Sequence, residues 1–166
     1  MTTLVSITFL LQLLVNPQPG ELTELRRLYA RAPLFKADAQ QFNKLLLPVD
    51  SSSAPVLCCY KGAAEMIAAK YAVNPVSKLQ RFNAGKAWIS AAVKRDTLAL
   101  EMRFIRFSIQ SNLPVFLGYR EDIGTDKEFV LRHVRNCADP ELKKMIIDYI
   151  TVSAALTAEE LKQLNK

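Results

Sequence analysis

The chain of 166 residues contains few glycines, histidines and cysteines: five, one and three, respectively. Five glycines are too few for a glycine-rich phosphate-binding architecture or for a β-sandwich with many turns. The single histidine, His133, excludes a metal enzyme with several histidine ligands. The sequence also contains no GxxxxGK[ST], HExxH, GxSxG or CxxC motif. The common nucleotide-binding, zinc-protease, serine-hydrolase and thiol-redox signatures are therefore absent.

The three cysteines, Cys58, Cys59 and Cys137, are an odd number and two of them are adjacent, so they cannot form a complete disulfide framework. Two functional alternatives use His133: a catalytic pair with Cys137, and a zinc site with all three cysteines. No oxyanion loop is evident near Cys137, and zinc-binding cysteines are usually separated by two or more residues. We therefore interpret the cysteines as small buried hydrophobic residues and expect no metal and no cofactor.

Half of the residues are hydrophobic and 23% are charged, which is enough apolar material for a folded core. The formal net charge is +6, but the basic residues are scattered in pairs with carboxylates nearby. A nucleic-acid-binding surface would need a clustered basic stripe. We therefore expect solvated faces and no nucleic-acid partner.

Residues 4–15 form an apolar stretch that is broken by the sequence Asn16-Pro-Gln-Pro-Gly20. A bilayer-spanning helix needs about 20 apolar residues, so we expect no stable membrane span. The length is that of the hydrophobic region of a signal peptide, although residues 1–3 carry no Lys or Arg and no A-x-A-like site follows. The sequence predicts an export signal over 1–20, a single domain over 21–166 and a periplasmic or secreted location. The alternatives are a first buried helix and a cytoplasmic location.

Helical spacing of apolar residues dominates the rest of the chain, and no run of alternating β-branched residues suggests a sheet. The pattern predicts helices over about 21–32, 36–47, 55–72, 75–94 and 97–111. Capping signals at Thr125, Asp139 and Thr157 predict three further helix starts. The predicted fold is all-α, with seven to eight helices arranged as a bundle or a short stack of antiparallel hairpins. Gly85 lies on an apolar helical stripe, which predicts the close approach of a neighbouring helix.

The segment 97–111 has apolar stripes on two sides, so we expect it to be the central helix, covered on both sides. Arg103, Arg106 and Gln110 share one strip of this helix. A buried arginine needs an acceptor. The candidate acceptors are Glu65, Glu101, Asp122 and Asp126.

Two interpretations of these arginines remain open. In the first, they form a polar network that fixes helix packing. In the second, they line a pocket for an anion or a peptide carboxylate, which the arginine fork suits. The following apolar turn, 114–119, contains Phe116 and Tyr119, and it either closes the end of the core or presents an exposed binding patch.

Several short motifs over about 55–150 together resemble a group of small, uncharacterised, mostly exported helical proteins of Gram-negative bacteria. The motifs are Tyr60-Lys-Gly62, Lys70-Tyr71, Asn74-Pro75, Phe82-Asn-x-Gly85, Glu101-x-Arg103-Phe-x-Arg106-Phe and Asn112-x-Pro114-x-Phe-Leu-Gly-Tyr119. The resemblance implies an all-α, tetratricopeptide-like fold and an envelope location, and it implies no activity, cofactor or catalytic residue.

These observations favour a non-catalytic protein- or peptide-interaction or scaffolding role in the bacterial envelope. The candidate binding residues are Arg103, Arg106, Gln110, Phe116 and Tyr119, and no residue is assigned a catalytic role. The alternative is a small anionic-ligand binder or an enzyme whose pocket centres on Arg103 and Arg106. That alternative requires an enclosed cavity into which at least one of these arginines points without a carboxylate partner.

Overall fold

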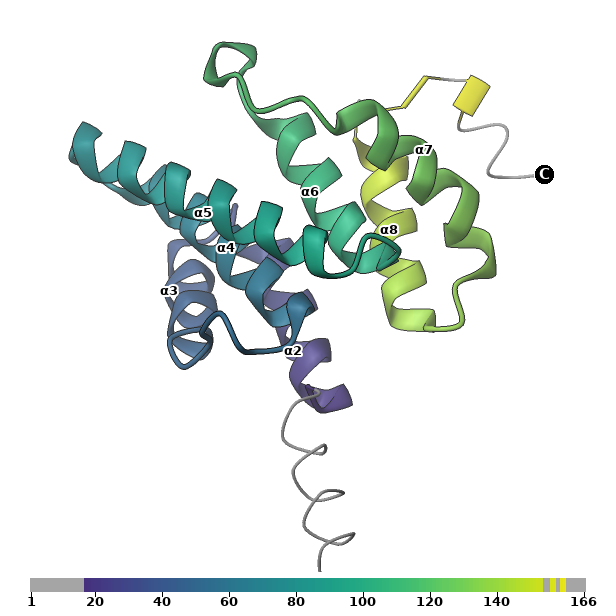
Figure 1. Ribbon diagram of the computed structural model, residues 1–166, viewed down its shortest axis with the longest axis horizontal. Helices are drawn as coiled ribbons and strands as arrows, with labels where there is room; N and C mark the ends of the chain where they lie inside the picture. Colours follow the sequence, from purple (N-terminus) through teal and green to yellow (C-terminus); the bar gives the residue numbers. More distant parts are fainter. Residues whose placement is uncertain (1–16, 154–155, 158, 161–166) are drawn as a thin grey trace, which may run out of the picture. The chain divides into compact units, whose positions relative to one another are not determined.

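A computed structural model of the chain describes residues 17–153, 156–157 and 159–160. Within these ranges the secondary structure is helical and contains no strand, so the predicted all-α fold is confirmed (Figure 1). The predicted export segment, 1–20, lies outside the described residues over its first sixteen positions. The elements are α2 (Pro19–Arg31), α3 (Lys36–Leu45), α4 (Pro55–Tyr71), α5 (Pro75–Arg95), α6 (Leu100–Asn112), η1 (Val115–Leu117), α7 (Ile123–His133), η2 (Val134–Asn136) and α8 (Pro140–Val152).

Proline begins four of these helices, α2, α4, α5 and α8. A proline at the first helical position loses no hydrogen bond, because that N–H has no partner within the helix. At the start of α8 the Asp139 carboxylate accepts hydrogen bonds from the backbone N–H groups of Glu141 and Leu142, at 3.0 and 3.1 Å. The predicted helix start at Asp139 is therefore confirmed.

The two predicted capping boxes have different outcomes. Thr157 and Glu160 form the reciprocal pair, with Thr157 N donating to Glu160 Oε2 at 2.8 Å and Glu160 N donating to Thr157 Oγ1 at 3.3 Å. The predicted start at Thr125 is wrong, because α7 already begins at Ile123. The Thr125 hydroxyl donates to the Asp122 carbonyl at 3.0 Å instead of accepting from a backbone N–H.

The chain divides into two compact units, Met1–Trp88 and Ile89–Lys166, and the division falls inside the continuous helix α5. The single domain predicted over 21–166 stays a prediction. None of the helices in the described part of the chain combines the length and the apolar character that crossing a membrane requires.

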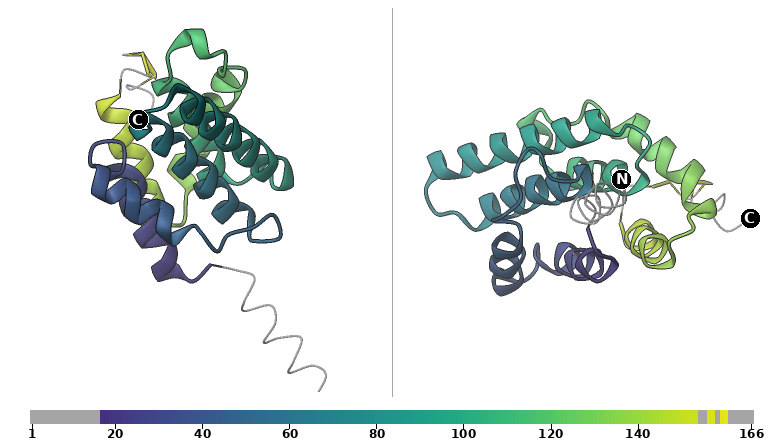
Figure 2. Two further views of the ribbon diagram at one scale, coloured as in Figure 1. Left: turned by 90° about the vertical axis from the view of Figure 1, so that its left-hand side faces the viewer. Right: turned by 60° about the horizontal axis from the view of Figure 1, so that its bottom comes forward.

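In the first unit, helices α2, α3 and α4 pack together (Figure 2). Their core includes an aromatic cluster of Tyr29, Phe42 and Tyr60, with ring centroids 5.9 to 6.3 Å apart. Cys58 and Cys59 are buried on α4, as the sequence predicts for small hydrophobic residues. Cation–π contact also occurs in this unit, where the Lys61 ammonium lies 5.1 Å from the centre of the Trp88 ring.

Helices α4 and α5 approach each other closely at Gly85. A Cβ atom built at this position would lie 2.6 Å from the Gly62 carbonyl oxygen and 2.5 Å from Met66 Cγ. Only a glycine fits there without moving backbone atoms. The close helix approach predicted from the sequence is therefore confirmed.

In the second unit, α6 packs on both α7 and α8. Nine of its thirteen residues are buried, which confirms the prediction of a helix covered on both sides. Phe104 and Phe107 both contact the Tyr149 ring of α8 edge-on, with centroid distances of 5.4 and 6.2 Å. The helix begins at Leu100 and not at Thr97, because the Asp96 side chain accepts a hydrogen bond from Leu98 N at 3.0 Å and holds a turn.

Candidate functional site

All five candidate binding residues lie in the second unit. Arg103, Arg106 and Gln110 are on α6, Phe116 is in η1, and Tyr119 is on the connection to α7. The structure separates them into an interior set and an exposed residue. Arg106, Gln110 and Tyr119 are buried and Arg103 is half-buried, whereas Phe116 is 85% exposed.

The interior set is organised by one carboxylate, Asp126 of α7, which is completely buried. Arg106 binds it in a bidentate manner, with Nε 2.6 Å from Oδ2 and Nη2 2.9 Å from Oδ1. Arg103 donates from Nη1 to Asp126 Oδ1 at 2.6 Å. The two arginines are one turn apart on α6, so a single aspartate of α7 joins two successive turns of the central helix.

A second carboxylate completes the charge balance around Arg106. Its Nη1 lies 3.0 Å from Asp122 Oδ2, at the start of α7. The pKa of Arg106 is raised above its ordinary value: burial, the largest influence, opposes the charge, but it is outweighed by hydrogen bonding to Asp126 and the charges of Asp126 and Asp122. The guanidinium therefore stays charged inside the unit.

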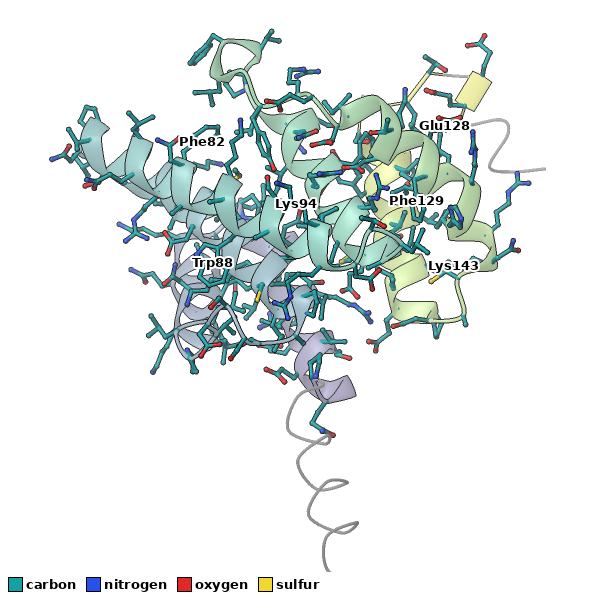
Figure 3. All side chains as sticks on the ribbon, viewed as in Figure 1. Phe82, Trp88, Lys94, Glu128, Phe129 and Lys143 are labelled. Carbon is teal, nitrogen blue, oxygen red and sulfur yellow. The ribbon has the colours of Figure 1, made fainter. Side chains whose placement is uncertain are left out.

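Arg103 makes two further contacts, one with the turn before α6 and one with α7. Its Nε donates to the Thr97 carbonyl at 2.9 Å, and its guanidinium carbon lies 4.9 Å from the centre of the Phe129 ring. The same ring stacks on His133, with centroids 4.0 Å apart, and Figure 3 labels Phe129 on α7. His133 Nδ1 lies 2.7 Å from the Phe129 carbonyl oxygen, within the same helix.

Two of the four acceptors named from the sequence, Asp122 and Asp126, are thus the partners of the candidate arginines. Glu65 pairs instead with Arg81, at 2.9 Å, in the first unit. Both candidate arginines point at carboxylates, which is the arrangement of a packing network. An anion pocket would instead require at least one arginine without a carboxylate partner.

Gln110 is the one candidate whose side chain is completely buried with neither amide atom hydrogen-bonded to a described residue. An unsatisfied buried polar group costs about 1–3 kcal/mol. We therefore expect Gln110→Met, which keeps the length and removes the amide, to raise the free energy of unfolding by about that amount.

Urea denaturation measures this change, with Gln80→Met on the exposed face of α5 as the control, expected to shift stability by less than about 0.5 kcal/mol. A loss of stability in Gln110→Met would contradict the prediction. It would mean that the amide binds a buried water or another ligand.

The exposed part of the candidate site is the turn that joins α6 to α7. Residues 113–118, called the η1 turn below, include Val115 and Phe116, whose exposed fractions are 73% and 85%. Gly118 has a φ of +62°, a left-handed conformation that favours glycine. Tyr119, which follows, is only 2% exposed. The turn therefore does both things that the sequence left open: Tyr119 enters the core and Phe116 is presented to solvent.

Comparison of the chain with protein-family models, with curated proteins and with solved structures gives no match. Any conclusion on function therefore rests on the residues and their geometry.

A groove of about 600 Å³ in the first unit was not predicted from the sequence. It lies between α3 and the corner where α4 ends and α5 begins, and its charged lining residues are Lys36 and Arg81. Its lining comes from residues 36–43 and 68–81, which are far apart in the chain. The only sequence signal is the polar face of the segment 36–47, and such a face is equally typical of plain solvent exposure.

The cysteines and the histidine do not come together as a metal site. No group of three or more His, Cys, Asp or Glu side chains in the described part of the chain has an arrangement that could hold a metal ion. Cys58 Sγ lies 3.2 Å from the Asp50 carbonyl oxygen and Cys137 Sγ lies 3.5 Å from the Asp139 carbonyl oxygen. These weak contacts are typical of structural thiols.

Proposed function

We propose that the chain is a non-catalytic protein-interaction or scaffolding protein of the bacterial envelope, which docks a protein partner through the η1 turn. The observation that carries this proposal is the neighbouring pair Val115 and Phe116, exposed at 73% and 85%. Aromatic side chains are frequent binding hot spots because they bury a large apolar area at low entropic cost.

The η1 turn is held in shape before any partner binds. Leu117 N donates to the Pro114 carbonyl and Gly118 N to the Val115 carbonyl, both at 3.1 Å. Arg120 Nη1 reaches back to the Leu113 carbonyl at 3.4 Å, across the two ends of the turn. A preorganised surface loses less entropy on binding than a flexible one.

The network around Asp126 supports the turn from the two helices on which it is mounted. Arg103 and Arg106 come from α6 and their acceptors from α7, so the helices before and after the η1 turn are clamped together. In this proposal the arginines are positioning residues for the turn. The alternative, a pocket for a small anion or an enzyme site around them, receives no support from their pairing with carboxylates.

Site-specific photo-crosslinking in the bacterial envelope fraction tests the proposal. A photoreactive amino acid at position 116 is expected to give one discrete adduct, and the same group at Leu98 none. Leu98 is the matched control, because it is an apolar residue of the same unit with 76% exposure. The fractionation also reports location, and recovery of the chain in the cytosolic fraction alone would favour the cytoplasmic alternative.

The adduct partner, once identified and purified, provides the quantitative test. Phe116→Ser is expected to weaken its binding at least about tenfold, or about 1.4 kcal/mol, and Leu98→Ser to leave it unchanged. Equal adducts at both positions, or a Phe116→Ser variant with unchanged affinity, would refute docking through the turn.

A further inference from the structure

The groove of the first unit has an unusual balance of charge. Its lining contains two cations, Lys36 and Arg81, and no carboxylate. Lys36 begins α3 and is exposed, and it makes no ion pair with any described residue. Arg81 Nη1 donates a hydrogen bond to Glu65 Oε2 at 2.9 Å, and Glu65 is not one of the lining residues. A guanidinium has five N–H donors, so this pairing orients Arg81 and leaves donors for a ligand.

The neutral polar lining residues suit a peptide backbone. Gln40, Asn43, Asn74 and Ser77 can each donate and accept hydrogen bonds, as a peptide group requires. Gln40 and Asn43 are three residues apart on α3, so they share one face of the helix. Asn74 Oδ1 accepts from Val76 N at 2.8 Å, and its amide hydrogens stay available to a ligand.

The rest of the lining is mainly apolar, and its Tyr71 side chain is held in place by a hydrogen bond. Tyr71 is anchored because its hydroxyl donates to the Ala32 carbonyl at 2.9 Å. Val73, one of the lining residues, is 95% exposed. The groove therefore offers apolar contact in the same lining as the two cations.

We propose that this groove binds an extended, acidic peptide segment of a protein partner, through glutamate or aspartate side chains that reach Lys36 and Arg81. This site lies in the first unit and does not depend on the η1 turn. Only two cations line it and one already pairs with Glu65, so single carboxylates match the groove better than a polyanion, whose binding grows with the number of cations contacted.

Fluorescence anisotropy with defined probes tests the proposal. The first probe is a labelled short peptide of alternating glutamate and valine, acetylated and amidated so that only its side chains carry charge. The second has glutamine in place of glutamate. The glutamate peptide is expected to bind at least about tenfold more tightly. Equal binding of the two peptides, or no binding of either, would overturn the proposal.

Matched charge reversals on α3 separate the groove from the overall charge of the protein. Lys36→Glu is expected to weaken binding of the glutamate peptide about tenfold or more. Lys44→Glu changes the same charge on the same helix outside the groove and is expected to have less than about a twofold effect. Equal losses in both variants would show that only net charge attracts the peptide, and would overturn the proposal.

Two further measurements complete the test. The first shows whether the groove binds carboxylates of a peptide or of a free small molecule, and the second shows whether the groove binds independently of the η1 turn. Free glutarate is expected to compete only at concentrations far above those of the peptide; competition at equal concentration would assign the groove to small carboxylates and overturn the peptide proposal. Phe116→Ser is expected to leave peptide binding unchanged. A loss of binding in that variant would contradict a separate site in the first unit.

Discussion

Asp126→Ala is expected to lower the free energy of unfolding by about 3–5 kcal/mol, because it leaves Arg106 buried and without its main partner. Asp126 accepts three of the hydrogen bonds that the two arginines donate, and none of its surface is exposed. Arg106 would keep only Asp122, which is itself 37% exposed. Urea denaturation of the purified protein measures the change.

Two companion variants show whether the loss comes from an uncompensated charge. Asp122→Ala removes the partly exposed partner and is expected to lower stability by only about 1 kcal/mol or less. The double variant Asp126→Leu with Arg106→Met removes the buried pair together and is expected to recover part of the loss, since apolar replacement of a buried ion pair is often tolerated. A loss below about 1 kcal/mol in Asp126→Ala would contradict the clamp between α6 and α7.

Gly85→Ala is expected to destabilise the protein by about 1–3 kcal/mol, the usual cost of overpacking. In an isolated helix the same change would be favourable by about 1 kcal/mol, because alanine is the better helix former. The sign is reversed here because the new methyl group would lie 2.6 Å from the Gly62 carbonyl oxygen, an atom that cannot move without its helix. Gly85→Leu is expected to be at least as damaging.

Gly124→Ala in α7 is the matched control, because a Cβ at that position would meet no atom within 4 Å. It is expected to leave stability unchanged or to raise it by up to about 1 kcal/mol. Thermal melting of the two variants side by side measures the difference in sign. An unchanged melting temperature in Gly85→Ala would refute the close contact of α4 and α5.

The Gly85 contact also bears on the proposed peptide groove. The groove is bounded by the end of α4 and the first turns of α5, and Gly85 lies about one turn beyond its lining residue Arg81, at a close contact of the two helices. If α5 has to move away from α4 to accommodate a methyl group, Asn74, Ser77 and Arg81 move with it. We therefore expect the affinity for the glutamate peptide to fall in Gly85→Ala. Asp126→Ala changes the second unit and is expected to leave this affinity unchanged.

Local chemistry made much of the helical framework predictable. Prolines at 55, 75 and 140 start α4, α5 and α8, as expected from their position before apolar helical stripes. Errors occurred where a short polar side chain had two possible hydrogen-bonding roles. Thr125 donates to a carbonyl where it was expected to cap a helix, and Asp96 holds a turn that delays the start of α6.

The candidate site was predictable only in part. The strip of Arg103, Arg106 and Gln110 follows from helical periodicity, and burial of the strip requires acceptors. Which acceptors these are does not follow, because Asp126 is twenty residues from Arg106 and Glu65 and Glu101 were equally eligible. The groove of the first unit could not be predicted, since its lining combines one face of α3 with a corner about thirty residues later.

The sequence by itself determined the all-α class, the placement of most helix starts and the need for a close contact at Gly85, because these depend on interactions within a few residues or on the absence of a side chain. The tertiary structure alone decided which carboxylates pair with Arg103 and Arg106, that Phe116 faces solvent while Tyr119 is buried, and that the lining of a groove contains two cations and no carboxylate. These features depend on which side chains of distant segments come into contact. A periodic pattern of apolar residues specifies which face of a helix is buried, but it does not specify the element against which that face packs.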